Sequence, residues 1–186
     1  MDMRRQMRRR PVAMGTDEVV RLVPLLPGQD LIWLATPTTD HVDLTAWVGS
    51  ARGHIDDLLL HHGAVLFRGF GLRSADDFAA TAAALCESLY GDYGDLPREA
   101  VGSKIYGVTP YPVNLSILFH NESSHLPAWP TKQFFFCLQP ASRGGATPLV
   151  DCAALYRALP PPLRERFEHL GLRYVRNFIP GLDVPW

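Results

Sequence analysis

Val113-Asn114-Leu115-Ser116-Ile117-Leu118-Phe119-His120-Asn121-Glu122 is a stretch with a two-residue alternation of side-chain character. Side chains two residues apart share one face of a β-strand. The odd-numbered positions therefore predict an apolar face, and the even-numbered positions predict a mixed face that carries Ser116 and His120. If the extended backbone continues, Glu122 joins His120 on the mixed face. The stretch predicts a β-strand that delivers two side chains able to converge on one metal ion.

The pair formed by His120 and Glu122 suits one kind of metal site in particular. An imidazole and a carboxylate supply two thirds of a 2-His-1-carboxylate facial triad, which holds Fe(II) and leaves positions open for substrate and oxygen. The tripeptide His-x-Glu also arises by chance, and the alternative is a strand end whose two polar side chains are solvated. The surrounding sequence has to decide between the two interpretations.

Composition limits the classes of protein to which the chain can belong. It has 186 residues, 47% of them hydrophobic, and a formal net charge of −1. This length suffices for one domain with a hydrophobic core. The net charge shows no excess of basic residues of the kind that indicates nucleic-acid binding. Cys86, Cys137 and Cys152 form no Cys-x-x-Cys pair, which favours reduced thiols in a cytoplasmic protein. No apolar run approaches the roughly 18 residues that span a membrane, so we expect neither a membrane nor a nucleic acid as partner.

The basic segment at the N-terminus is predicted to lie outside the domain. No apolar segment follows its arginines, so it is not a secretory signal. A nucleic-acid-binding arm is one interpretation, but the composition favours a disordered leader over residues 1–15. Residues 16–186 contain neither an internal repeat nor a linker, and we expect them to belong to one domain.

Local signals along the chain predict alternating strands and helices. Ser74 and Asp77 have the spacing of a capping box, Gly63 and Gly171 stand at helix ends, and Asp151 is a helix cap. Helices are expected over residues 44–62, from Ser74 to Leu89, over 152–159 and over 160–170. An edge strand and a turn are expected within residues 19–34. Further strands are expected over residues 64–67, 104–108, 113–122, 134–138 and 172–178, and over the part of 144–151 that follows its glycines.

Four blocks of sequence occur together in a specific order. They are His61-His62-Gly63-Ala64-Val65-Leu66-Phe67-Arg68-Gly69-Phe70, Phe119-His120-Asn121-Glu122, Trp129-Pro130 and Gly144-Gly145-Ala146-Thr147-Pro148-Leu149-Val150-Asp151. In this order and spacing, the chain from about residue 20 onward resembles the TauD/TfdA-like family of Fe(II)- and 2-oxoglutarate-dependent dioxygenases. The resemblance is closest to the SyrP-like branch, whose hydroxylases work beside nonribosomal peptide synthetases. It implies a fold of the α+β or mainly β class, a cupin-like double-stranded β-helix (jelly roll) with flanking helices.

The resemblance also implies roles for individual residues. His120 and Glu122 correspond to the first two iron ligands, and Thr147 corresponds to a hydroxyl that hydrogen-bonds the carboxylate of 2-oxoglutarate. The alternative for Thr147 is a β-branched residue in the turn before Pro148. Ser116, on the predicted face of His120, and His125, where related sequences often have tyrosine, are candidate substrate contacts, although His125 also fits a solvent-facing position.

The predicted function is that of a hydroxylase that uses Fe(II) and 2-oxoglutarate. Glu122 favours hydroxylation over halogenation, because related halogenases lack this carboxylate and place halide there. The resemblance suggests a small amino-acid-like substrate, tethered to a peptidyl carrier protein, in antibiotic or nonribosomal peptide biosynthesis. The family's remaining iron-ligating His and its 2-oxoglutarate-binding Arg come later in a full-length member than Trp186 does here. We therefore expect residues 16–186 to be the N-terminal part of an oxygenase domain, truncated at its C-terminus.

Two other functions remain open at the level of sequence. One is a non-catalytic remnant that serves as an interaction module. The other is a cupin-like metal-dependent hydrolase or isomerase that uses His120, Glu122 and His125, and it would need neither oxygen nor 2-oxoglutarate.

Overall fold

A computed structural model of the chain describes residues 19–89, 100–102, 104–107 and 115–175. The chain divides into two compact units, Met1–Leu72 and Arg73–Trp186. The predicted leader, residues 1–15, lies outside the described residues.

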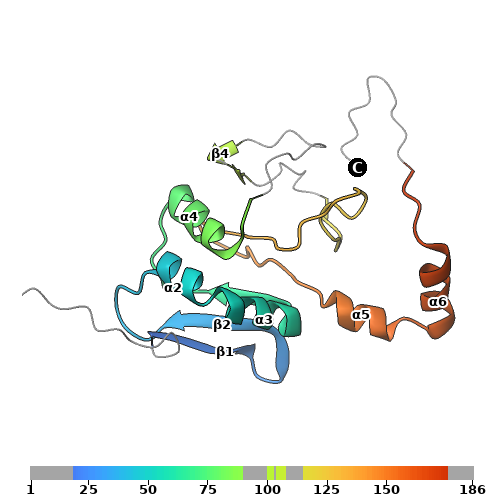
Figure 1. Cartoon of the computed structure of the whole chain (residues 1–186), viewed down its shortest axis with the longest axis horizontal. Helices are drawn as coiled ribbons and strands as arrows, with labels where there is room; N and C mark the ends of the chain where they lie inside the picture. Colours follow the sequence, from blue (N-terminus) through green and yellow to red (C-terminus); the bar gives the residue numbers. More distant parts are fainter. Residues whose placement is uncertain (1–18, 90–99, 103, 108–114, 176–186) are drawn as a thin grey trace, which may run out of the picture. The chain divides into compact units, whose positions relative to one another are not determined.

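A three-stranded sheet forms the base of the first unit (Figure 1), with strand order β1-β2-β3. β1 (Val20–Leu26) pairs antiparallel with β2 (Gln29–Pro37), and β2 pairs parallel with β3 (Ala64–Phe67). Pro27 and Gly28 join the first two strands, and Gly28 has a φ of 76°. Proline followed by a residue with positive φ is typical of a type II turn, in which glycine adopts the second position without steric cost. The prediction of a strand and a turn in this segment is confirmed.

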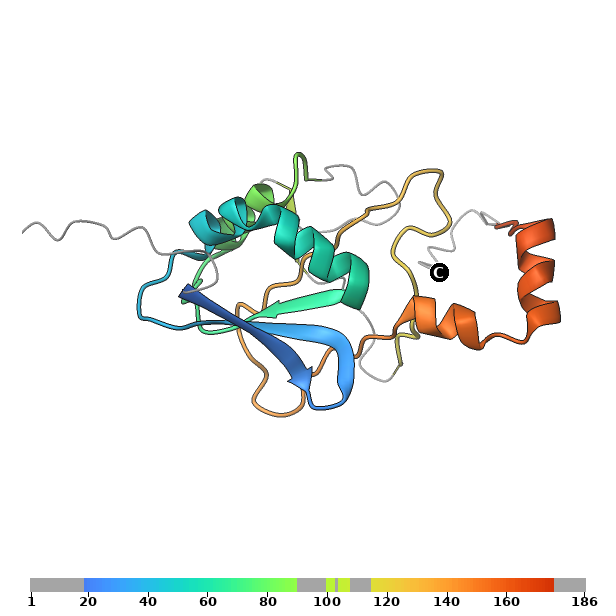
Figure 2. The same ribbon diagram turned by 60° about the horizontal axis from the view of Figure 1, so that its bottom comes forward.

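Two helices connect β2 to β3 and cover one face of the sheet (Figure 2). α2 (Leu44–Ser50) begins where the Asp43 carboxylate accepts a hydrogen bond of 3.0 Å from the Ala46 backbone N–H. α3 (Arg52–His62) follows after Ala51 and ends at Gly63, whose φ is 106°. The predicted helix over 44–62 is therefore confirmed, with a break at Ala51.

The core of the first unit lies between these helices and the sheet. α3 contacts both β2 and β3. The buried apolar side chains of this unit are Val20, Ala35, Leu44, Trp47, Val48, Ala51, Ile55 and Leu58. Burial of this apolar surface supplies the main driving force for folding of the unit.

The second unit begins with α4 (Ala75–Leu85). The Ser74 hydroxyl accepts a hydrogen bond of 3.1 Å from the Asp77 N–H, and the Asp77 carboxylate accepts one of 3.1 Å from the Ser74 N–H. This is the predicted capping box, although the helix ends at Leu85 rather than at Leu89. Two short strands follow, β4 (Ala100–Gly102) and β5 (Ile105–Tyr106), and they pair antiparallel. The latter confirms part of the predicted strand over 104–108, of which residue 108 lies outside the described residues.

Two more helices follow in the described part of the second unit. α5 (Cys152–Ala158) begins where the Asp151 carboxylate accepts a hydrogen bond of 2.8 Å from the Ala154 N–H. α6 (Pro161–Leu170) has proline in its first turn and ends at Gly171, whose φ is 65°. Both helices agree with the prediction, because the sequence carries their caps locally.

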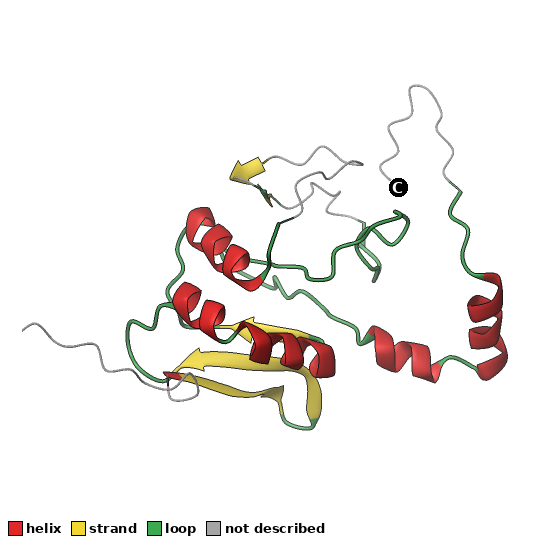
Figure 3. Cartoon of the chain, viewed as in Figure 1, coloured by secondary structure: helices red, strands yellow, loops and turns green. Residues whose placement is uncertain are grey.

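The strands predicted after residue 112 are absent from the described residues (Figure 3). Residues 115–122, 134–138, 144–151 and 172–175 form no strand, while 113–114 and 176–178 lie outside the described residues. An alternating pattern makes a strand only where a neighbouring strand pairs with its backbone N–H and C=O groups, and no strand pairs with these segments in the described part of the chain. The described residues combine a mixed sheet with helices, as in the α+β class, and they do not close a jelly roll.

Candidate metal-binding site

His120 and Glu122 lie close together although they are not on a strand. The His120 Nε2 atom is 3.7 Å from the Glu122 Oε2 atom. The exposed fraction is 49% for the His120 side chain and 20% for that of Glu122. Two ligands that are each about 2.1 Å from one divalent metal ion stand at most about 4.2 Å apart. Two adjacent ligands of a facial triad form an angle of about 90° and stand about 3.0 Å apart. The observed separation is near this spacing but wider, so the two side chains would have to approach slightly to share an ion.

A hydrogen bond within the same segment orients the His120 ring. Its Nδ1 atom is 2.8 Å from the Leu118 carbonyl oxygen. The carbonyl can only accept, so Nδ1 carries the proton, and in the neutral ring Nε2 keeps its lone pair. A metal-binding histidine commonly donates its other ring N–H in this way. The atom of His120 nearest to Glu122 is therefore the one that is able to bind a metal.

A turn follows these two side chains directly, and neither of them lies on a strand. Ser123 has a φ of 56°, in the left-handed region that non-glycine residues rarely adopt. The Leu126 N–H donates to the Ser123 carbonyl at 3.0 Å, and the Ser124 N–H donates to the Asn121 carbonyl at 3.4 Å. The backbone therefore changes direction directly after Glu122. We refer to residues 120–125 as the ligand turn.

The other predicted site residues lie in exposed segments. Ser116 is exposed in the segment before the ligand turn, and Thr147 is exposed in a loop. His125 belongs to the ligand turn, and its ring centroid lies 6.3 Å from that of Tyr174. No hydrogen bond joins Thr147 or Ser116 to the metal-binding pair among the residues that the structure describes. The roles of Thr147, Ser116 and His125 stay predictions.

Two glycines shape the turn that precedes Thr147. Gly144 and Gly145 have φ values of 70° and 78°. A Cβ atom on Gly145 would lie 2.9 Å from the Cβ atom of Ala141, which is closer than carbon atoms normally approach. Glycine is therefore required at this position for both conformational and steric reasons.

A third metal ligand is not found in the described part of the chain. Nowhere in residues 19–89, 100–102, 104–107 and 115–175 does a group of three or more His, Cys, Asp or Glu side chains come together in a way that could hold a metal ion. His125 therefore does not complete a three-ligand set with His120 and Glu122. The hydrolase or isomerase hypothesis, which needs that set, gains no support from the structure.

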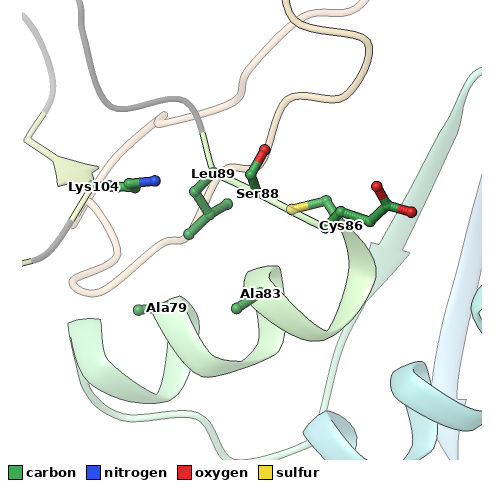
Figure 4. A pocket seen from close by; sticks show the side chains of 7 residues that line it. Ala79, Ala83, Cys86, Ser88, Leu89 and Lys104 are labelled. Carbon is green, nitrogen blue, oxygen red and sulfur yellow. The ribbon is translucent and has the colours of Figure 1, made fainter.

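A separate cavity lies beside α4 (Figure 4), and it contains none of the predicted site residues. Its volume is about 370 Å³. It is lined by Ala79, Ala83, Cys86, Glu87, Ser88, Leu89 and Lys104. Cys86 is half-buried at this cavity, and its Sγ atom donates to the Ala82 carbonyl oxygen at 3.2 Å.

Sequence reasoning missed two residues that contact the ligand turn. The Cys152 Sγ atom donates to the Asn121 Oδ1 atom at 3.3 Å across 31 positions of the sequence. The Tyr174 hydroxyl donates to the Ser124 Oγ atom at 3.4 Å across 50 positions. Neither contact has a local signal, because each depends on how distant segments pack.

No helix in the described part of the chain is long and apolar enough to cross a membrane.

Comparison with known proteins places the chain in a family. Residues 25–183 match the family model described as "Taurine catabolism dioxygenase TauD, TfdA family". The matched region includes the metal-binding pair, Thr147 and both residues that contact the ligand turn.

Two relatives are similar over most of this chain. The dapdiamide synthesis protein DdaC of Enterobacter agglomerans is 29% identical over 164 residues, which cover 88% of this chain and 49% of that protein. A clavaminate synthase-like protein of Arabidopsis thaliana is 35% identical over 136 residues, which cover 71% of this chain and 41% of that protein. The chain therefore spans about half the length, or less, of these curated relatives. Because the family model matches far more than half of its residues, the chain belongs to the TauD/TfdA dioxygenase family.

Proposed function

We propose that this chain contributes His120 and Glu122 to the Fe(II) site of a cytoplasmic 2-oxoglutarate-dependent hydroxylase. The observation that carries the proposal is the geometry of the pair. The Nε2 and Oε2 atoms are 3.7 Å apart, and the hydrogen bond to the Leu118 carbonyl places a ring proton on Nδ1 rather than leaving Nδ1 as the metal ligand. Family membership makes Fe(II) the metal that these ligands are expected to hold.

Each of the other predicted residues has a part in this proposal. Thr147 would hydrogen-bond the carboxylate of 2-oxoglutarate, and Ser116 and His125 would contact the substrate. When bound, iron together with 2-oxoglutarate and oxygen would supply the oxidising chemistry. The protein's own task is to bind these components and to orient them, and Glu122 occupies the ligand position that a halide would need. We also propose that the described elements contribute to a jelly roll, which is the fold that the family implies.

A role in biosynthesis is the part of the proposal that a relative's name supports. DdaC is named for the synthesis of dapdiamide. We propose a small amino-acid-like substrate, carried on a peptidyl carrier protein, in a biosynthetic pathway of the antibiotic or nonribosomal-peptide kind. A free amino acid is the alternative form of the same substrate class.

An anaerobic titration tests the proposal. Fe(II) and 2-oxoglutarate are added to the purified 186-residue chain, and to any longer form that its gene encodes, and the visible absorption of the ternary complex is recorded. We expect the absorption band to depend on both His120 and Glu122. His61→Ala is the matched control, because this histidine ring lies on α3 against the Asp57 carbonyl oxygen at 2.7 Å. A band of full intensity in His120→Ala would refute the assignment.

A second function, that of an interaction module, is favoured by a different observation. Many large apolar side chains between residues 115 and 175 are exposed, among them Leu118 at 80% and Phe135 at 76%. Exposed apolar surface of this kind often marks a protein–protein contact. A polypeptide that supplies further strands would cover it and would pair with the backbone of the segments that form no strand here.

The two functions differ in what the chain binds. An interaction module binds its partner equally well when both metal ligands are replaced, and it shows no ternary-complex band. An oxygenase component shows the band in at least one of its forms, and the band disappears in the ligand variants. A co-purification experiment with the His120→Ala and Glu122→Ala double variant separates the two outcomes.

A further inference from the structure

Asn121 lies between the two predicted metal ligands, and a distant thiol contacts its side chain. The Cys152 Sγ atom donates to the Asn121 Oδ1 atom at 3.3 Å. Cys152 is the first residue of α5, and the Asp151 cap fixes where that helix begins. The start of α5 is thereby linked to the middle of the His120–Glu122 segment.

A second distant side chain contacts the other end of the ligand turn. The Tyr174 hydroxyl donates to the Ser124 Oγ atom at 3.4 Å. The Tyr174 ring lies edge-on to the His125 ring, with 6.3 Å between the centroids. Tyr174 follows α6 and Gly171, whose left-handed backbone ends the helix. The two contacts therefore come from the first residue of α5 and from the segment after α6.

From these contacts we propose that Cys152 and Tyr174 are positioning residues for the His120–Glu122 pair. The inference rests on the proposed function, since it concerns the same metal-binding pair. The ligand turn is exposed except at Glu122 and Ser123, which are half-buried, and Ser123 has a left-handed backbone conformation that costs free energy. A segment with so little burial keeps one geometry only where other contacts hold it. The two hydrogen bonds act on either side of Glu122, and they come from two independent parts of the chain.

The expected size of the effect follows from the kind of contact. Neither residue touches the metal, so removing one contact loosens the turn but leaves both ligands in place. Loss of one neutral hydrogen bond lowers the population of the held conformation, and hence metal affinity, by about twofold to tenfold. Loss of both contacts multiplies these factors if the contacts are independent.

The test uses conservative variants of the 186-residue chain and two independent measurements. Cys152→Ala removes the thiol donor, whereas Cys152→Ser keeps a donor at the same place. Tyr174→Phe removes only the hydroxyl. The matched controls are Cys137→Ala, an exposed cysteine outside the ligand turn, and Tyr156→Phe, whose hydroxyl donates to Glu168.

The first measurement is amide hydrogen exchange of residues 119–126 without metal, and the second is a titration with Co(II) followed by its visible absorption. We expect Cys152→Ala and Tyr174→Phe to exchange faster in this segment by about twofold to tenfold, and to bind Co(II) more weakly by a similar factor. Cys152→Ser and the two controls are expected to behave as the unaltered chain.

The outcomes separate the positioning inference from the proposed function. If the unaltered chain binds no Co(II), the metal site in this chain is refuted, while exchange still decides whether the two residues hold the turn. If Co(II) binds but exchange and affinity are the same in Cys152→Ala, Tyr174→Phe and the controls, the positioning inference is overturned. Failure of Cys152→Ser to restore exchange would also overturn the role of the Cys152 hydrogen bond.

Discussion

Replacement of Ile55 by alanine should destabilise the first unit by about 3 kcal/mol. The Ile55 side chain is 1% exposed, on the face of α3 that contacts the sheet. The substitution removes three carbon atoms, which are worth about 0.8 kcal/mol each as transferred apolar groups. The cavity left behind adds to this loss, and Ile-to-Ala changes in cores cost about 2–5 kcal/mol. Such a loss is a large part of the roughly 5–15 kcal/mol that stabilises a typical domain.

Urea unfolding, followed by tryptophan fluorescence, measures the free energy of unfolding of the first unit when the tryptophans of the second unit are replaced. In a background in which Trp129 and Trp186 are replaced by phenylalanine, Trp33 and Trp47 remain, and both belong to the first unit. The matched control is Leu60→Ala on the same helix, since Leu60 is 82% exposed and its loss should change stability by no more than about 0.5 kcal/mol. A loss below about 1 kcal/mol for Ile55→Ala, or equal losses for the two variants, would show that α3 does not pack on the sheet as described.

Three further predictions concern the second unit. Glu122→Gln keeps the shape of the side chain but removes its charge, so Co(II) affinity should fall at least about tenfold; unchanged binding in the titration would rule out Glu122 as a ligand. Thr147→Val should weaken 2-oxoglutarate binding by about 1.5–3 kcal/mol, or roughly tenfold to a hundredfold, in an anaerobic titration; an unchanged concentration dependence would leave Thr147 a structural residue. The Arg73 N–H, followed by the Ser74 hydroxyl, lowers the pKa of Asp77 below its ordinary value of 3.8. The contribution of the Asp77 cap to the stability of α4 should therefore be complete above pH 3.8 and be lost as pH falls through the lowered pKa. Amide hydrogen exchange in the first turn of α4 measures this loss. The same pH profile in Asp77→Asn would contradict the prediction.

Local signals allowed the helices, the turn at Gly28 and the strand over 64–67 to be predicted, but not the pairing of the strands in the first sheet. A helix start or end depends on a few neighbouring residues, and the capping box of Ser74 and Asp77 is complete within four consecutive residues. The turn at Gly28 and the helix ends at Gly63 and Gly171 likewise follow from backbone conformations that glycine adopts at low cost. These features need no knowledge of distant segments, and the structure contains all of them.

The strands of the middle region could not be predicted in the same way. The alternation over residues 113–122 describes which side chains would share a face, but a strand also needs a partner for its backbone groups. Among the described residues, Leu115, Ile117 and Phe119 are exposed, so their predicted apolar face is not buried. The alternation is therefore consistent with a strand whose partner the described residues do not supply.

His120 and Glu122 lie close together, as predicted, but in a different backbone geometry from the one predicted. Strand alternation predicted that His120 and Glu122 share a face, whereas their polar atoms lie 3.7 Å apart in a segment that forms no strand and leads directly into a turn with Ser123 in the left-handed region. This difference matters for function, because a strand is held along its length by its ladder, whereas an exposed turn is held by whatever contacts it. In this chain those contacts include Cys152 and Tyr174, which lie 31 and 50 positions from their partners. We therefore expect the precision of the proposed iron site to depend on the start of α5 and on the segment after α6, and substitutions of Cys152 or Tyr174 should alter metal binding although neither residue is a ligand.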